Sequence, residues 1–155
     1  MKKVYDTINQ YCVEHELLTN GDGIVIGLSG GMDSVCLLQV LAALRNEWQL
    51  RLVCVHVHHG IRGTAADEDA AFAQRLAAKY NISFRLYEMD IPQLAKEQGL
   101  SEEEAGRNYR YRCFEEVRKE LNFDKIAVAH HRDDQAETVL WQILRGSGLR
   151  GVCGM

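Results

Sequence analysis

One short segment constrains the fold of this chain more than any other: Ser29-Gly30-Gly31-Met32-Asp33-Ser34, here called the glycine loop. It follows the apolar run 23–28 and precedes the periodic run 35–41. This pattern predicts a buried strand, a tight turn and the first turn of a helix. The two glycines have no Cβ, which allows positive φ angles and a close approach of the backbone to a ligand.

A glycine turn between a strand and a helix is suited to binding phosphate. The first N–H groups of the helix have no partner within it and carry a partial positive charge. Ser29 and Ser34 add hydroxyl donors, whereas the carboxylate of Asp33 would repel a phosphate unless a cation lies between them. Mg²⁺ at Asp33 would resolve this conflict, and Mg²⁺ accompanies nucleotide phosphates. The loop is neither a Walker A motif nor a dinucleotide fingerprint. A capped turn without a ligand is the alternative.

Composition indicates an ordinary globular domain. The chain has 155 residues, of which 46% are hydrophobic and 26% charged, and we expect one domain over residues 1–155. The net charge of −4 argues against binding nucleic acid by bulk electrostatics. Five cysteines without a C-x-x-C pair predict a reduced, cytoplasmic protein without a zinc site. The sequence contains neither an apolar run of membrane-spanning length nor a signal peptide, so no membrane partner is expected.

Apolar runs and helical patterns alternate along the chain. Strands are expected at 24–28, 50–57, 83–89 and 125–129. Helices are expected at 2–16, 34–45, 67–80, from 92, at 102–121 after a capping box at Ser101, and from Asp133 or Asp134 to Leu144. The alternation predicts an α/β fold: a Rossmann-like open parallel sheet with helices on both faces.

Three polar motifs follow strands and are therefore expected at the same edge of the sheet, where ligands bind in such folds. The first is the glycine loop. The second, at 56–62, contains His56, which alternation turns inward, and favours a phosphate or nucleoside contact over zinc. The third follows the strand 125–129 and contains His130, Asp134 and Glu137. Its two carboxylates could bind a cation, accept from an exocyclic amine or take a proton; solvated acids on a capped helix are the alternative.

Two arginines provide a fourth candidate. Arg107 and Arg110 are three residues apart on the helix 102–121, so they lie on neighbouring parts of one face. A guanidinium there could stabilise a phosphoryl-transfer transition state, or could simply lie at the surface of the helix. The glycine-rich run 145–155 ends the chain without a further element, and we expect a longer protein, with a mobile tail as the alternative.

These motifs together resemble the ATP-pyrophosphatase, or PP-loop, superfamily, whose signature is the Ser-Gly-Gly-x-Asp-Ser loop. Within it, the runs 130–138 and 145–151 look like the tRNA(Ile)-lysidine synthetase family, and Arg107-x-x-Arg110-Tyr111 and His59-Gly60-Ile61-Arg62 fit as well. The resemblance covers the chain from about residue 22 onward.

The resemblance implies a ligase that uses ATP and Mg²⁺. Such an enzyme adenylates the position-two carbonyl of the wobble cytidine of an isoleucine tRNA, and free L-lysine then displaces AMP. Carried over, Ser29, Gly30, Gly31, Met32, Asp33 and Ser34 bind ATP, with Asp33 beside the metal ion. Arg110 acts on the phosphate or the adenylated intermediate, and Asp134 and Glu137 hold the cytosine edge or the incoming lysine. The resemblance thus implies a catalytic set of Asp33, Arg110, Asp134 and Glu137, with His130 and Arg107 as further substrate-binding residues. Met32 contributes only its backbone.

The chain departs from this family in three ways. Gly106 replaces an expected alanine, and His58 stands where Asp or Asn is commoner, which leaves the role of His58 open. C-terminal tRNA-binding domains are also missing, so we expect weak tRNA binding by this chain. Two alternatives remain: a tRNA thiolation enzyme, many of which carry a C-x-x-C pair, and a nucleotide-binding module without catalysis.

Overall fold

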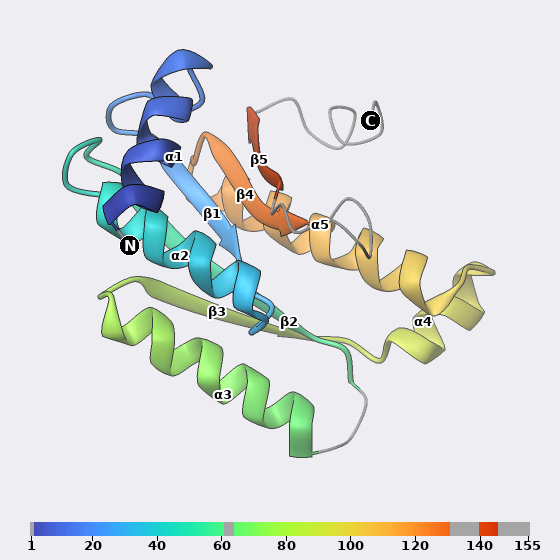
Figure 1. Ribbon diagram of the computed structural model, residues 1–155. Helices are drawn as coiled ribbons and strands as arrows, with labels where there is room; N and C mark the ends of the chain where they lie inside the picture. The colour runs from blue at the N-terminus through green and yellow to red at the C-terminus, as the bar shows by residue number, and fades with distance from the viewer. Residues whose placement is uncertain (1, 61–63, 131–139, 146–155) are drawn as a thin grey trace.

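The architecture is a five-stranded sheet with helices on both faces (Figure 1). The computed structural model describes residues 2–60, 64–130 and 140–145. In chain order the elements are α1 Lys2–Glu14, β1 Gly23–Gly27, α2 Met32–Leu44, β2 Arg51–His58, α3 Thr64–Lys79, β3 Ser83–Glu88, α4 Ile91–Gln98, α5 Glu102–Glu120, β4 Lys125–His130 and β5 Leu140–Arg145. The alternation predicted from the sequence is confirmed as far as β4. The largest displacement of a boundary is at α3, which begins at Thr64 instead of Asp67.

The strands lie in the order β3-β2-β1-β4-β5, and the first four of these are parallel to their neighbours. Strand β1 occupies the centre and all five of its residues are buried. Buried parallel strands read as continuous apolar runs, because helices cover both of their faces. This explains why residues 23–28 were recognisable as a strand without any polar alternation.

The last element differs from the prediction. A helix was expected to continue to Leu144, but residues 140–145 form β5, which pairs antiparallel with β4 through His130↔Leu140 and Lys125↔Arg145. A short apolar run is compatible with either structure, and this one contains the strand-favouring residues Trp141 and Ile143. Pairing with the open edge of β4 decides the outcome, and it makes the sheet mixed instead of wholly parallel. Residues 133–139 of the expected helix lie outside the described residues.

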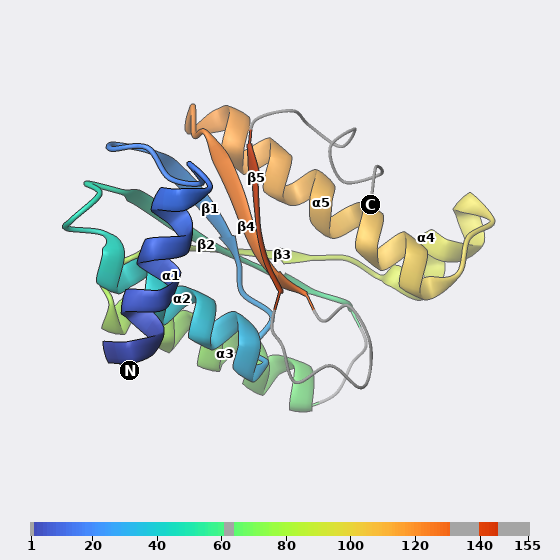
Figure 2. The same ribbon diagram turned by 45° about the horizontal axis from the view of Figure 1, so that its top comes forward.

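Side chains of the central strand alternate between two cores. Ile24 and Ile26 join the cluster under α1, α2 and α3, whereas Val25 faces the opposite cluster under α5. Figure 2 shows α1, α2 and α3 on one side of the sheet and α5 on the other, with α4 packed at the start of α5. Ser101 is the N-cap of α5, and its Oγ accepts from the Glu104 N–H at 3.2 Å, so the predicted cap is confirmed.

The connections create a reversal in the sheet. From β1 the chain moves outward through α2 to β2 and through α3 to β3, and then returns across the other face through α4 and α5 to β4. Strands β1 and β4 are therefore neighbours whose following segments diverge. In open α/β sheets the crevice at such a reversal, beyond the carboxyl ends of the strands, is where ligands bind.

Candidate functional site

The glycine loop leaves the carboxyl end of β1 and is closed by its two serines. Ser34 Oγ donates to the carbonyl of Gly31 at 2.9 Å and accepts from the N–H of Ser29 at 3.2 Å. The two hydroxyl oxygens are 3.1 Å apart, and the N–H of Gly31 donates to Ser29 Oγ at 3.3 Å. Because Ser34 is buried in the first turn of α2, these bonds tie the loop to the helix that follows it.

Both glycines were expected to allow a positive φ angle, but only Gly30 has one. Gly30 has φ +92°, which disfavours any side chain, whereas Gly31 is extended with φ −71° and ψ 157°. Gly31 is the N-cap of α2, and it offers the helix no side-chain hydrogen bond. The positive end of the helix dipole therefore faces outward at the loop, the arrangement expected of an anion-binding site.

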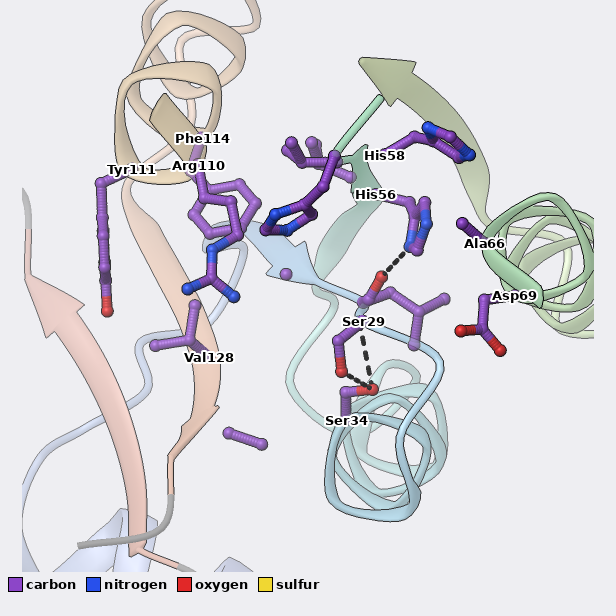
Figure 3. Close-up of a pocket in the computed structure, with 16 residues that line it drawn as sticks. Ser29, Ser34, His56, His58, Ala66, Asp69, Arg110, Tyr111, Phe114 and Val128 are labelled. Atoms are coloured by element: carbon purple, nitrogen blue, oxygen red, sulfur yellow. Dashed lines mark hydrogen bonds between the residues drawn. The ribbon is translucent and has the colours of Figure 1, made fainter. Parts of the chain in front are cut away.

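A cavity of about 350 Å³ opens beside the glycine loop. Its floor is formed by the carboxyl ends of β1, β2 and β4, and α3 and α5 supply its walls (Figure 3). The side chains with polar groups that line it are Ser29, Ser34, His56, His58, His59, Asp69, Arg110 and Tyr111. The prediction that motifs after separate strands meet at one edge of the sheet is confirmed for the first two motifs.

His56 is inward, as alternation predicted, and is 5% exposed. Its Nδ1 lies 2.7 Å from the carbonyl oxygen of Leu28, the residue that leads into the glycine loop. His58 has the role that the sequence left open. Its Nδ1 accepts from the N–H of Gly60, and its Nε2 is 3.1 Å from Asp67 Oδ1 on α3. His58 thus holds the segment after β2 to the first turns of α3.

The two arginines of α5 separate. Arg110 is half-buried and lines the cavity, and burial lowers its pKa without removing the charge of a guanidinium. Arg107 is exposed and its guanidinium carbon lies 6.0 Å from the ring centre of Tyr111. It is not among the residues that line the cavity. The structure therefore brings Arg110, but not Arg107, to the glycine loop.

His59 stands beside Arg110 against α5. Gly106 makes room for it, since a Cβ at that position would lie 3.2 Å from His59 Cε1. Burial lowers the pKa of His59, and the neighbouring charge of Arg110 lowers it further. Both effects favour the neutral form of the imidazole. His59 and Arg110 also line a smaller cavity, together with Ile91, Glu102 and Glu103.

The structure describes only some of the remaining candidate residues. His130 is the last residue of β4, at the edge where the cavity opens, while Asp134 and Glu137 lie outside the described residues. Met32 is 88% exposed and does not line the cavity. The sequence did not reveal Asp69 as a candidate. Its Cβ lies 3.6 Å from the position that a Cβ on Gly30 would occupy. Asp69 belongs to no motif, so only the packing of α3 reveals it.

A family profile decides the identification. The profile described as the PP-loop domain matches residues 2–155. This chain belongs to the PP-loop domain family. The curated relatives of this PP-loop domain include a protein named tRNA(Ile)-lysidine synthase from Caldanaerobacter subterraneus subsp. tengcongensis, which is 49% identical over the whole chain. Another of the same name, from Clostridium tetani, is 41% identical over 98% of the chain. The chain spans about a third of the length of each, 32% in both cases.

Solved structures agree on the fold of this PP-loop domain. The U34-tRNA thiolase NcsA from Methanococcus maripaludis, with its [4Fe-4S] cluster, superposes with a TM-score of 0.64 at 22% identity. It covers 82% of this chain and 45% of the thiolase. An NH3-dependent NAD synthetase from Campylobacter jejuni, in complex with a nitrate ion, gives 0.59 at 19% identity over 81% of this chain and 54% of its own. At these identities the likeness concerns the fold alone.

Within the described part of this PP-loop domain, no three His, Cys, Asp or Glu side chains are grouped as a metal site. Asp33 offers a carboxylate in the first turn of α2, beside the outward-facing helix end. Mg²⁺ is typically held by one or two carboxylates together with substrate phosphates, so a single acid at this position fits the ion. None of the described helices is long and apolar enough to cross a membrane.

Proposed function

We propose that this PP-loop domain binds ATP in the cavity beside the glycine loop and transfers its adenylate group to a tRNA base. The observation that carries the proposal is the meeting of three features at one cavity: the glycine loop, which Ser29 represents in its lining, the first turn of α2, which Ser34 represents, and Arg110. The first two supply donors and positive potential for phosphates, and the guanidinium supplies a full charge. Membership of the PP-loop domain family supports the use of ATP.

The substrate assignment follows from the relatives. Proteins named tRNA(Ile)-lysidine synthase are 37–49% identical to this chain over nearly its whole length. We propose the reaction that the name describes: lysine is joined to position two of the wobble cytidine of an isoleucine tRNA. The carbonyl oxygen of the base attacks the α-phosphorus of ATP and pyrophosphate leaves. The ε-amine of lysine then attacks the ring carbon, loses a proton, and AMP leaves with the oxygen.

Residues of this chain have a proposed role in each step. Ser34 and the N-terminal N–H groups of α2 bind the phosphates, and Arg110 stabilises negative charge that develops at the α-phosphate. Asp33 would hold Mg²⁺, which neutralises phosphate charge when bound. Asp134 and Glu137 are proposed to hold the cytosine edge or the incoming lysine, and His130 to line their side of the site. Arg107, which lies outside the cavity, is proposed to contact tRNA.

Transfer of lysine tests the proposal. A protein that carries this chain at the length of its relatives is incubated with ATP, Mg²⁺, radiolabelled lysine and isoleucine tRNA with a CAU anticodon. Label is expected in the RNA, and methionine tRNA with the same anticodon is the control. The chain of 155 residues alone is expected to bind ATP but to bind tRNA only weakly, because its net charge is −4.

A matched pair of variants assigns the reaction to the glycine loop. Asp33→Asn and Glu102→Gln each remove one acid from the first turn of a helix. Asp33→Asn is expected to abolish lysine transfer and Glu102→Gln to leave it unchanged. Label in the RNA at the wild-type rate with Asp33→Asn would refute the metal role. Sulfur transfer instead of lysine transfer would favour the thiolation alternative, which draws only on likeness of fold.

A further inference from the structure

His56 has one nitrogen committed to the protein and one open to the cavity. A carbonyl oxygen only accepts hydrogen bonds, so the Nδ1 that lies 2.7 Å from Leu28 O must carry the proton. In the neutral imidazole the other nitrogen, Nε2, is then an acceptor. Leu28 is the first residue beyond β1, so this bond also fixes the tautomer at the entrance to the glycine loop.

The Nε2 atom meets the space where a ligand would lie. Among the described residues, His56 makes no second hydrogen bond, and no buried side-chain nitrogen or oxygen lacks a partner. Nε2 is therefore not sealed within the protein, although the side chain is 95% buried by the residues around it. What remains accessible faces the cavity that His56 lines, next to Ser29 and Ala66 (Figure 3).

The lone pair on Nε2 decides which end of a nucleotide it can meet. Phosphate oxygens are acceptors, so an acceptor nitrogen in a buried site repels them and requires a donor. The donors of the site, the N–H groups at the start of α2 beside Ser34, lie on the opposite side of Ser29 from His56. A nucleotide whose phosphates meet those donors can offer His56 only a donor of its nucleoside.

We propose that His56 is a specificity residue that accepts a hydrogen bond from the nucleoside of the bound nucleotide. Two groups of ATP have this chemistry: a ribose hydroxyl and the 6-amino group of adenine. The inference rests on the proposed ATP binding and adds the direction in which the nucleotide lies. It changes the expectation for the motif 56–62 from a phosphate or nucleoside contact to a nucleoside contact alone.

The test combines a variant of His56 with analogues of ATP. In His56→Asn the amide nitrogen takes the place of Nδ1 and keeps the bond to Leu28 O, whereas the acceptor at Nε2 is removed. Calorimetry on the 155-residue chain measures the Kd of ATP, 2′-deoxyATP, 3′-deoxyATP and purine riboside triphosphate, which lacks the amino group. The loss of one hydrogen bond is expected to weaken ATP binding roughly three- to tenfold in His56→Asn.

One analogue is expected to bind the wild-type chain as weakly as ATP binds the variant, and to lose nothing further in the variant. That analogue identifies the donor. Equal ATP affinity of the two proteins, or equal weakening of all three analogues by the substitution, would overturn the inference while leaving ATP binding in place. If the variant does not fold, unchanged affinity of the wild type for all three analogues overturns it. A wild-type chain that binds no ATP would refute the proposed function itself.

Discussion

The hydroxyl oxygens of Ser29 and Ser34 lie 3.1 Å apart, so the two ends of the glycine loop are joined side chain to side chain. Ser34 also bonds the N–H of Ser29 and the carbonyl of Gly31, and it is 4% exposed. The shape of the loop therefore depends on one buried hydroxyl. A bound phosphate would either compete for this hydroxyl or be oriented by it. In both cases Ser34 influences the binding of phosphate.

Replacing Ser34 by alanine is expected to weaken ATP binding at least tenfold. The N–H of Ser29, which is only partly buried, loses its acceptor, which costs about 0.5–1.5 kcal/mol of stability, and the loop no longer holds its shape. Ser101→Ala is the matched control, because loss of that cap costs about 1 kcal/mol at a site away from the glycine loop. Urea unfolding and calorimetric titration separate the two effects. If both variants bind ATP equally, the hydroxyl of Ser34 has no role in binding.

The two glycines of the loop should respond differently to alanine. Gly30→Ala forces a side chain into φ +92° and is expected to lower stability by about 1–3 kcal/mol and to reduce ATP affinity. Gly31→Ala keeps an ordinary extended conformation, and its Cβ would meet only Ser29 Oγ at 3.5 Å. It should lower stability by no more than about 1 kcal/mol, because only the poorer N-cap preference of alanine is involved. Unfolding curves that show equal losses for the two variants would contradict this conformation of the loop.

The difference between the two arginines of α5 is testable with the same substitution. Arg110→Gln should weaken ATP binding, because a half-buried guanidinium leaves the cavity, and should reduce adenylate transfer by about 10²–10³-fold. Arg107→Gln removes an exposed charge of equal size on the same helix and should leave ATP affinity unchanged. Titration with ATP at two salt concentrations measures both. Equal weakening by the two variants would indicate a diffuse charge effect instead of a contact.

Stability should fall below neutral pH because of His59. Burial and the charge of Arg110 lower its pKa in the folded state, so the unfolded chain takes up a proton at a higher pH than the folded one. The contribution of this side chain is complete above the ordinary value of 6.5 and is lost as pH falls through the folded pKa. His59→Asn should therefore lose less stability than wild type between pH 7 and pH 5. An NMR titration of the imidazole with a midpoint above 6.5 would reverse the sign.

The sequence predicted the fold as far as its signals were local. The buried run at β1, the cap at Ser101 and the turn at Gly30 each depend on a few neighbouring residues. The expected helix at 140–144 was wrong because a short apolar run fits either element, and the edge of β4 decided it. Neither of the two segments carries a sequence signal that indicates its pairing partner.

The functional site also contains residues that local sequence predicts and residues that only tertiary packing places. The glycine loop and His56 were predicted, since the loop directly follows one buried strand and His56 lies near the carboxyl end of another. The choice of Arg110 over Arg107 could not be made, because spacing places both on one region of the helix and only packing shows which is turned inward. Asp69 and the role of His58 arise from contacts with α3, which has no motif of its own.

The most direct measurement is a crystal structure of the chain with a non-hydrolysable ATP analogue and Mg²⁺. The phosphates are expected within hydrogen-bonding distance of Ser34 and the first N–H groups of α2, with the nucleoside extending past His56. Nucleotide bound elsewhere, with the glycine loop empty at saturating concentration, would contradict the account.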